Sequence, residues 1–188
     1  MTTTVSVENL IIVGGVSGLT AAIYSSQAKI KTIVLEGPKP GGALAQSHCV
    51  NNWPGMYQQP GLKIVDEIRS QAAKSGAKIR SDTCTEIFFD TYPYLVITDK
   101  CNYHAYNIIL AMGREPNYLG LPGEMKYWGS RISNCAVCDG LNFKGKKVLV
   151  IGGGDSAFVE ADYLSSMCQS VTILVRGHLI KAKEKSYM

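Results

Sequence analysis

The sequence lacks a long hydrophobic run, a low-complexity tract and any block of like charge. No apolar run approaches the roughly 18 residues that a membrane-spanning helix needs, and residues 1–9 have neither the charged start nor the apolar core of a secretory signal. Acidic and basic residues are interleaved, with a net charge of +4 over 188 residues. We therefore expect a cytoplasmic protein with no surface for nucleic acid or a membrane.

Closely spaced cysteines are also scarce. Four of the six cysteines are scattered and are interpreted as small buried hydrophobic residues: Cys49, Cys84, Cys101 and Cys168. Only Cys135 and Cys138 lie close together, in a C-x-x-C pattern. A structural zinc site needs four ligands, and the sequence has no second C-x-x-C and no H-x₃₋₅-H pair, so no metal site is predicted.

Apolar periodicity at the start of the chain predicts a strand, a glycine turn, a helix and a second strand. Residues 9–13 are a short apolar run, glycines follow, and apolar residues then recur at helical spacing up to Ser26. Residues 31–35 form another apolar run. Because both runs are apolar on both faces, they indicate a buried parallel sheet.

The middle of the chain holds a long irregular segment and several regular elements. Residues 37–60 are rich in glycine, proline and asparagine, which predicts a functional loop that contacts a ligand. Residues 64–77 predict a helix with Gly76 as its C-cap. Three further strands are expected, the first two as a hairpin: residues 85–89, 94–98 and 106–110.

The strand, turn and helix pattern begins again in the last quarter of the chain. Residues 147–151 predict a strand, three glycines follow, residues 157–164 predict a helix, and residues 171–175 predict a strand. Two such units suggest an α/β protein with two nucleotide-binding domains. We place these domains at residues 1–117 and 118–188.

The first glycine turn is related to the G-x-G-x-x-G pattern of dinucleotide-binding proteins. Gly15 and Gly18 occupy its second and third positions, where glycine lets the backbone approach a pyrophosphate at a helix N-terminus. Val13 occupies the first position, where the tight turn favours glycine. Glu36 ends the second strand, where a carboxylate accepts hydrogen bonds from ribose hydroxyls. Together these features predict a dinucleotide site.

The second glycine turn, Gly152–Ala157, matches G-x-G-x-x-A in full. The strand that follows ends in cations, at Arg176, His178 and Lys181, instead of an acid. Because a cation accepts a 2′-phosphate and a carboxylate repels it, this site favours NADP(H) over NAD(H). A solvated basic strand end is the alternative interpretation.

The Cys135–Cys138 pair is the predicted reactive centre. A C-x-x-C pair closes a disulfide with little loop entropy, and a nearby positive helix end lowers the pKa of one thiol. Asp139 follows directly. It is either an acid that protonates a departing thiolate or the start of a turn with Gly140.

In their order along the chain, these motifs resemble the low-molecular-weight thioredoxin reductases, which are class II pyridine nucleotide-disulfide oxidoreductases. The matching stretches are Gly18–Tyr24, Val34–Gly37, Gly41–Gly42, Asn52–Gly55, Ala111–Gly113, Leu119–Gly123, Cys135–Gly140 and Gly152–Ala157. A C-x-x-C-D-G sequence just ahead of the second glycine turn, combined with an FAD-type first turn, is typical of that family.

The resemblance implies a fold of two Rossmann-like domains that bind FAD and NADPH. The implied FAD-binding residues are Gly15, Ser17, Gly18, Glu36, Gly37, Gly42, Leu44, Asn52 and Gly113. The implied NADPH-binding residues are Gly152, Gly154, Asp155, Ser156, Arg176 and Lys181. Electrons would pass from NADPH through FAD to the disulfide, with Cys138 facing the flavin, Cys135 attacking a thioredoxin-like partner and Asp139 supplying a proton. Family members rotate one domain against the other and usually form homodimers.

The sequence also departs from the family pattern. Besides Val13, Ala43 stands where the family commonly has a glutamine, and Gly177 and Lys181 replace two arginines. Family members continue beyond Met188, so we expect a fragment whose second domain is incomplete and whose first domain lacks its C-terminal return segment. Such a fragment would expose its core and be poorly soluble.

Two alternative functions stay open. One is a catalytically silent dinucleotide-binding remnant of such an enzyme. The other is an enzyme of the same kind that takes electrons from reduced ferredoxin or another protein instead of NADPH.

Overall fold

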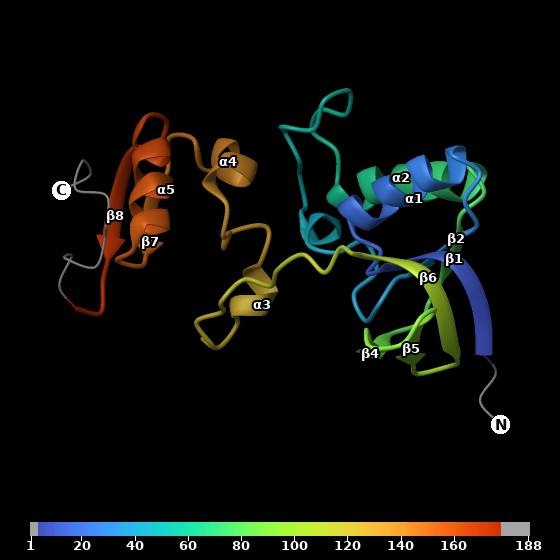
Figure 1. The fold of residues 1–188 in the computed structure, drawn as a ribbon. Coiled ribbons are helices and arrows are strands. Elements are labelled where there is room, and N and C mark those ends of the chain that lie inside the picture. Colours follow the sequence, from blue (N-terminus) through green and yellow to red (C-terminus); the bar gives the residue numbers. More distant parts are fainter. Residues whose placement is uncertain (1–3, 178–188) are drawn as a thin grey trace. The chain divides into compact units, whose positions relative to one another are not determined.

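The computed structural model describes residues 4–177, and its elements are labelled in Figure 1. The chain divides into two compact units. Unit 1 comprises Met1–Ser47 and Pro60–Asn117, and unit 2 comprises His48–Gln59 and Tyr118–Met188. The long irregular loop is therefore shared, because its middle part belongs to unit 2 although the chain on both sides of it belongs to unit 1.

Unit 1 is built on a six-stranded sheet of order β3-β2-β1-β6-β5-β4. Its strands are β1 (Thr4–Ile12), β2 (Thr32–Leu35), β3 (Lys78–Arg80), β4 (Cys84–Phe88), β5 (Tyr94–Thr98) and β6 (Asn102–Leu110). The four strands from β3 to β6 in this order are parallel, whereas β4 and β5 add an antiparallel hairpin to the edge of β6. The predicted parallel sheet and hairpin are confirmed.

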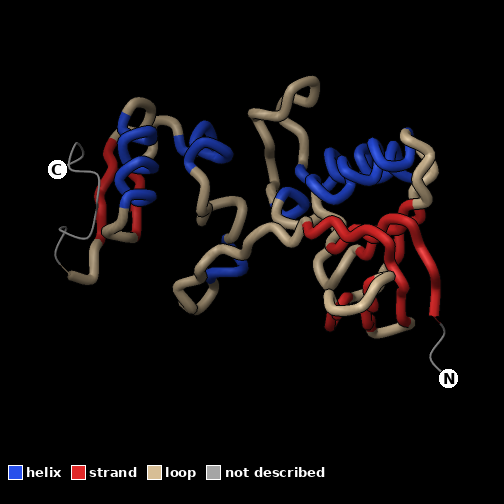
Figure 2. Tube along the Cα trace, in the orientation of Figure 1, coloured by secondary structure: helices blue, strands red, loops and turns tan. Residues whose placement is uncertain are grey.

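Two helices, α1 (Val16–Gln27) and α2 (Gly61–Lys74), cover one face of the parallel strands (Figures 1 and 2). A short 3₁₀ turn, η1 (Leu44–Gln46), lies beside α2. Alternate residues of β1 serve two cores: Ile11 packs with the helices, whereas Leu10 and Ile12 pack with the hairpin strands on the other face. This double burial explains why the strand is apolar on both faces.

Unit 2 has a smaller regular core. Its elements are α3 (Glu124–Tyr127), α4 (Ala136–Asp139), η2 (Gly140–Phe143), β7 (Lys147–Ile151), α5 (Asp155–Ser165) and β8 (Ser170–Leu174). Strands β7 and β8 are parallel, and α5 packs on one face of them. The other face leaves Leu149, Ile151 and Leu174 each about half exposed. Among residues 4–177, no element covers this apolar face, and exposed apolar surface is what the sequence led us to expect.

Each predicted strand and helix is present, but several ends differ. Strand β1 begins at Thr4 and β6 at Asn102, earlier than their apolar runs suggest, because both are extended by pairing with each other. Helix α2 ends at Lys74 instead of residue 77, and Gly76 follows in a left-handed conformation with φ +109°. Strand β3 was not predicted, because three residues with charged ends carry no strand pattern.

Candidate functional site: two glycine turns and a disulfide

The first glycine turn brings two backbone segments close together without intervening side chains. Helix α1 begins directly after Gly15, and a Cβ atom placed on Gly18 would lie 2.1 Å from the carbonyl oxygen of Val13. Gly15 forms a bridge with Gly41 of the long loop, and a Cβ on Gly42 would lie 3.3 Å from the Cα of Gly15. These glycines form a narrow cradle at the start of a helix, which fits the pyrophosphate of a dinucleotide.

Val13 adopts a left-handed conformation with φ +79° in this turn. The expectation that the position favours glycine is confirmed, because a β-branched residue with positive φ is strained. The side chain is half-buried and packs against the core that contains Leu10 and Ile12. Val13 therefore gains apolar contacts at the expense of backbone strain.

Glu36 is buried at the end of β2 and is paired with an arginine from α2. Arg69 Nε lies 2.8 Å from Glu36 Oε1, and Arg69 Nη2 lies 3.2 Å from Oε2. The Glu36 side chain is 6% exposed and that of Arg69 is 48% exposed. A carboxylate has about four acceptor positions, so this two-point pairing leaves capacity for ribose hydroxyls. Arg69 was missed by the sequence analysis, because a helix-surface arginine gives no local signal of a partner 33 residues away.

A pocket of about 290 Å³ opens at the carboxyl ends of β1 and β2. It is mostly apolar, and its walls include Val13, Gly37, Cys84 and Met112. Ligands of open α/β sheets bind outside the carboxyl ends of the strands. The sequence analysis named Gly37 but not the β4 residues, because only the tertiary fold places the hairpin beside the first glycine turn.

The other predicted FAD-binding residues lie in different places. Ser17 is exposed in the first turn of α1, and Leu44 is half-buried in η1. Gly113 follows β6, whose last residue pairs with the last residue of β1, so it lies beyond the same edge of the sheet. Asn52 falls in unit 2, where its amide Nδ2 donates to the Val137 carbonyl oxygen at 3.5 Å.

The second glycine turn leaves open space at the start of α5. A Cβ atom on Gly153 would lie 2.2 Å from Val175 Cγ1, whereas a Cβ on Gly154 would have no neighbour within 4 Å. Helix α5 begins directly after Gly154, so the backbone N–H groups of its first turn face this space. The turn therefore has room for a phosphate.

The predicted residues around this space are exposed. Asp155 and Ser156 lie in the first turn of α5, and Arg176 follows β8. His178 and Lys181 lie outside the described residues.

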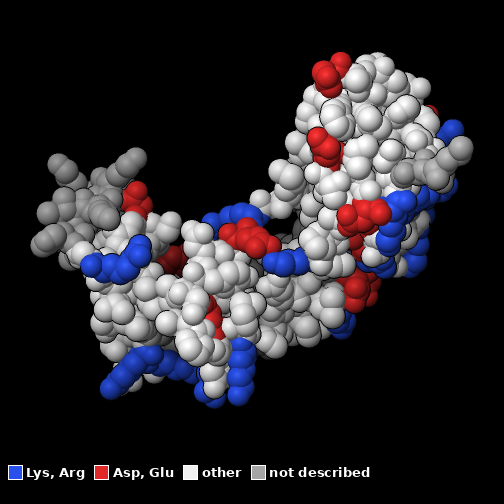
Figure 3. Space-filling model, turned by 90° about the horizontal axis from the view of Figure 1, so that it is seen from below, with Lys and Arg blue, Asp and Glu red and all other residues white. Residues whose placement is uncertain are grey.

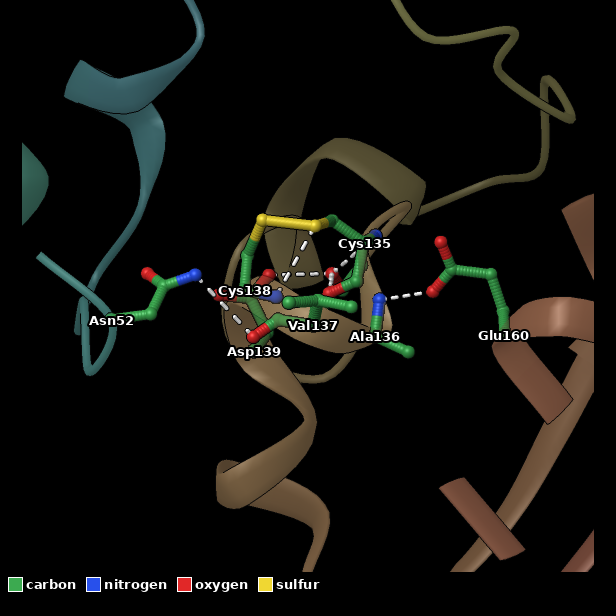
Figure 4. The surroundings of a disulfide bond; sticks show 8 residues. Asn52, Cys135, Ala136, Val137, Cys138, Asp139 and Glu160 are labelled. Carbon is green, nitrogen blue, oxygen red and sulfur yellow. Dashed lines mark hydrogen bonds between the residues drawn. A yellow bond between two sulfur atoms is a disulfide. The ribbon is translucent and has the colours of Figure 1, made fainter. Parts of the chain in front are cut away.

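A disulfide joins Cys135 to Cys138, as their spacing predicts, with a Cα–Cα distance of 5.3 Å (Figure 4). The two cysteines lie at α4, with Cys135 as its N-cap residue. The Cys138 N–H donates to Cys135 Sγ at 3.2 Å. A hydrogen bond of this kind favours negative charge on the sulfur that accepts it once the pair is reduced.

Asp139 is a buried acid at the end of α4, with 8% of its surface exposed. The Ser133 hydroxyl donates to the Asp139 carboxylate. The hydroxyl oxygen of Ser133 in turn accepts a hydrogen bond from the Cys135 N–H at 3.1 Å. Burial raises the pKa of Asp139, and the hydrogen bond from Ser133 opposes this shift in part. A raised pKa is the direction that a proton donor near neutral pH requires.

Glu160 of α5 reaches the other end of α4. Its Oε2 accepts the backbone N–H of Ala136, the residue after Cys135 (Figure 4). Ala136 itself is 7% exposed. The sequence analysis missed Glu160 because a single acid on an amphipathic helix gives no indication that it contacts a segment 24 residues earlier.

The other four cysteines are unpaired and half-buried, so the interpretation of them as buried hydrophobic residues is wrong. Cys84 and Cys101 sit at the margin of the hairpin core, where packing covers them only in part. Burial raises the pKa of the Cys84 thiol, which makes this thiol less reactive.

The surface carries charge of both signs, as the sequence does. On the face drawn in Figure 3, lysine and arginine are interspersed with acids and with uncharged surface. Within residues 4–177, no helix has the length and apolar character to cross a bilayer. The same residues contain no cluster of three or more histidine, cysteine or acidic side chains suited to a metal ion.

Comparison with known proteins shows which family has this sequence. A family model described as pyridine nucleotide-disulphide oxidoreductase matches residues 8–186. The chain is 38% identical over 181 residues to a thioredoxin reductase of Coxiella burnetii, covering 94% of this chain and 56% of that protein. It is 37% identical over 186 residues to a thioredoxin reductase of Mycolicibacterium smegmatis, covering 98% and 60%.

A solved structure gives a similar result. The crystal structure of thioredoxin reductase from Streptococcus pyogenes MGAS5005 matches with a TM-score of 0.88 and 31% identity, over 97% of this chain and 60% of that one. The chain therefore spans somewhat more than half the length of these relatives.

Proposed function

Because the chain belongs to the pyridine nucleotide-disulphide oxidoreductase family, we propose that it is the part of a thioredoxin reductase that carries the redox disulfide. Family membership and the thioredoxin reductase relatives imply FAD and NADPH as cofactors. The observation that carries the proposal is the closed Cys135–Cys138 disulfide beside a buried acid, in a chain with two glycine cradles.

The first glycine turn and its surroundings fit FAD, and we assign residues 1–117 as the FAD-binding domain. The paired glycines remove side chains where a pyrophosphate would lie, and Glu36 accepts two hydrogen bonds from Arg69 near the turn. The proposed FAD-binding residues are Gly15, Ser17, Gly18, Glu36, Gly37, Gly42, Leu44, Asn52 and Gly113. When bound, FAD supplies a ring that accepts electrons from NADPH and passes them to a disulfide.

The residues of unit 2 fit a phosphate-bearing dinucleotide, and we assign residues 118–188 as the NADPH-binding domain. The space beside Gly154 and the N–H groups of α5 suit the pyrophosphate, and exposed Arg176 suits a 2′-phosphate. The proposed NADPH-binding residues are Gly152, Gly154, Asp155, Ser156, Arg176 and Lys181.

The dithiol step uses three residues of this chain. Reduction of the disulfide takes two electrons and two protons, and we assign Cys138 to the side that faces the flavin. The Cys135 thiol loses its proton to solvent, and its thiolate attacks one sulfur of a partner disulfide, so that the partner S–S bond breaks and a mixed disulfide forms. The other partner sulfur leaves and takes a proton from Asp139, which regains one from solvent. The Cys138 thiol loses its proton to solvent and attacks the Cys135 sulfur, so that the second partner sulfur leaves, takes a proton from solvent, and the Cys135–Cys138 disulfide closes again.

The proposed protein substrate is a thioredoxin-like protein, as the names of the relatives suggest. We also propose a homodimer in the complete enzyme and a cytoplasmic location. The unpaired state of the other four cysteines supports a reducing compartment. Light scattering of the full-length enzyme tests the homodimer, and a measured mass of one chain would exclude it.

The proposed function is tested with the full-length enzyme that contains this sequence, purified with FAD. We expect NADPH to bleach the flavin absorbance without oxygen, and added thioredoxin to be reduced. Cys138→Ser is the matched control, which should still allow flavin bleaching but abolish thioredoxin reduction. Flavin that NADPH leaves oxidised would exclude NADPH as the donor, and thioredoxin reduction by the Cys138→Ser protein would exclude the assigned dithiol.

A further inference from the structure

The redox helix α4 is held by a carboxylate from another element. Glu160 lies on α5, and its Oε2 accepts the N–H of Ala136 immediately after Cys135 (Figure 4). Helix α4 packs against α5, and Ala136 is buried between neighbours. A negative charge is thereby fixed one residue from a redox sulfur, in a place where packing restricts its screening by water.

Such a charge acts differently on the two redox states. The disulfide is neutral, whereas the reduced pair carries thiolate character that is favoured at Cys135 by the N–H of Cys138, 3.2 Å from its sulfur. A neighbouring carboxylate repels a thiolate and so raises the free energy of the reduced pair. Disulfide pairs whose reduced form is stabilised are oxidising, so the opposite influence makes a pair more reducing.

We propose that Glu160 is a positioning residue that both holds the start of α4 and keeps the Cys135–Cys138 pair strongly reducing. This inference rests on the proposed redox function of the pair and adds a residue that sets its direction. Electrons flow toward the more oxidising of two cysteine pairs. Destabilising the dithiol of the donor pair therefore shifts the equilibrium toward reduction of the partner disulfide.

Asp139 is the last residue of α4 and is a second acid near the redox pair, so the effects of the two acids must be separated by experiment. Asp139 lies at the C-terminal end of α4 and is bonded to the Ser133 hydroxyl. Glu160 contacts the N-terminal end through a backbone N–H. Substitution of Glu160 leaves the Asp139 contact in place, so it changes one charge at a time.

The test measures the reduction potential of the pair in the full chain with dithiothreitol buffers. In this equilibrium, the protein disulfide and reduced dithiothreitol form the protein dithiol and the cyclic disulfide of dithiothreitol, so no cofactor or thioredoxin takes part. Glu160→Gln keeps an acceptor for the Ala136 N–H but removes the charge. We expect its equilibrium constant for reduction to rise about tenfold, which is equivalent to about 30 mV.

Two controls separate charge from packing. Asp162→Asn removes an exposed acid from the same helix and should leave the potential unchanged, whereas Glu160→Ala removes the acceptor as well and should also lower the unfolding midpoint. In a Cys138→Ser background, alkylation of Cys135 followed by mass spectrometry should show a lower thiol pKa with Glu160→Gln.

The outcomes are distinct from those of the proposed function. An unchanged or lower potential in Glu160→Gln would overturn the role of Glu160, even if the full-length enzyme reduces thioredoxin. A tenfold rise in the equilibrium constant for reduction would support it, even if thioredoxin proved not to be the substrate.

Discussion

The two strand–turn–helix–strand units share a backbone pattern but treat charge in opposite ways. In unit 1 the second strand ends in buried Glu36, which Arg69 pairs at two points. In unit 2 the equivalent strand is followed by exposed Arg176, and the buried carboxylate of Asp139 accepts a hydrogen bond from the Ser133 hydroxyl. The same turn geometry is therefore followed by a buried carboxylate in one unit and by an exposed cation in the other.

The glycines of the two turns also have different surroundings. In unit 1, Gly18 allows a helix to pack closely against the preceding strand, whereas in unit 2, Gly154 borders empty space. The comparison teaches that a glycine pattern mixes positions needed for folding with positions needed for ligand access. Substitutions at these positions test the distinction.

The largest expected effect is that of Gly18→Ala. Its Cβ would lie 2.1 Å from the Val13 carbonyl oxygen, and backbone cannot move aside cheaply. We expect unit 1 to lose stability at the upper end of the roughly 1–3 kcal/mol typical of overpacking, measured by circular dichroism during urea unfolding. Gly154→Ala is the matched control and should change stability by less than about 0.5 kcal/mol while weakening NADPH binding. Equal losses in both variants would break the comparison.

Removal of the Arg69 side chain should have the next largest effect. Arg69→Met leaves the Glu36 carboxylate buried without its hydrogen-bond donors, which lowers the free energy of unfolding by about 1–3 kcal/mol. We expect a loss in the lower half of this range because Arg69 is half exposed. Urea unfolding measures the loss. The double variant Arg69→Met/Glu36→Gln should recover part of it, and a double variant as unstable as the sum of both single variants would show that the two side chains do not interact.

Two substitutions of Val13 isolate the strain in the first turn. Val13→Ala and Val13→Gly both remove the side-chain contacts, but only glycine adopts φ +79° without a steric penalty. We expect the Gly variant to be more stable than the Ala variant by about 1 kcal/mol, by circular dichroism in urea. An Ala variant of equal or greater stability would contradict the left-handed conformation.

The smallest expected effect concerns Asp139 of unit 2. Because burial raises the pKa of Asp139 above its ordinary 3.8, its contribution to stability is complete below that pH and is lost as pH rises through the folded-state pKa. Asp139→Asn should therefore gain stability relative to the parent protein between about pH 4 and about pH 7. A difference that stayed constant across this range would contradict the shift.

Unfolding of unit 2 can be followed selectively. Both tryptophans of the chain, Trp53 and Trp128, belong to this unit. Tryptophan fluorescence therefore measures the effect of Asp139→Asn on the stability of unit 2. We expect this signal to change little with the substitutions in unit 1. Asp162→Asn serves as the control for a general change in charge.

The sequence was most informative where the relevant contacts are local. The strained position of Val13, the start of α1 after Gly15 and the disulfide within four residues all follow from short-range geometry. Each depends on residues close in sequence, whose spacing decides the backbone conformation. Patterns of glycine, apolar residues and cysteine were therefore sufficient.

Contacts between distant segments could not be predicted in the same way. Arg69 contacts Glu36 and Glu160 contacts Ala136, across 33 and 24 residues of sequence. Arg69 and Glu160 are charged residues on helices, and in the sequence they look like ordinary solvent-exposed positions. The pocket beside Val13 needs the β4 hairpin, whose place at the sheet edge depends on pairing through β6. Strand β3 is too short and too polar to give a signal.

The hydroxyl of Ser133, which joins the amide of Cys135 to the carboxylate of Asp139, makes residues 133–139 a self-contained chemical element. Closing so short a loop costs little chain entropy, so we expect the two sulfurs and the Asp139 carboxylate to keep their mutual geometry even when the surrounding sheet loosens. Under the proposed role of Glu160, the reduction potential of the pair depends on the contact with α5. We therefore expect that, after partial unfolding of unit 2, the Cys135–Cys138 dithiol still exchanges with disulfides but has an altered reduction potential. Such damage would change the direction in which electrons flow and would leave the reactivity of the thiols intact.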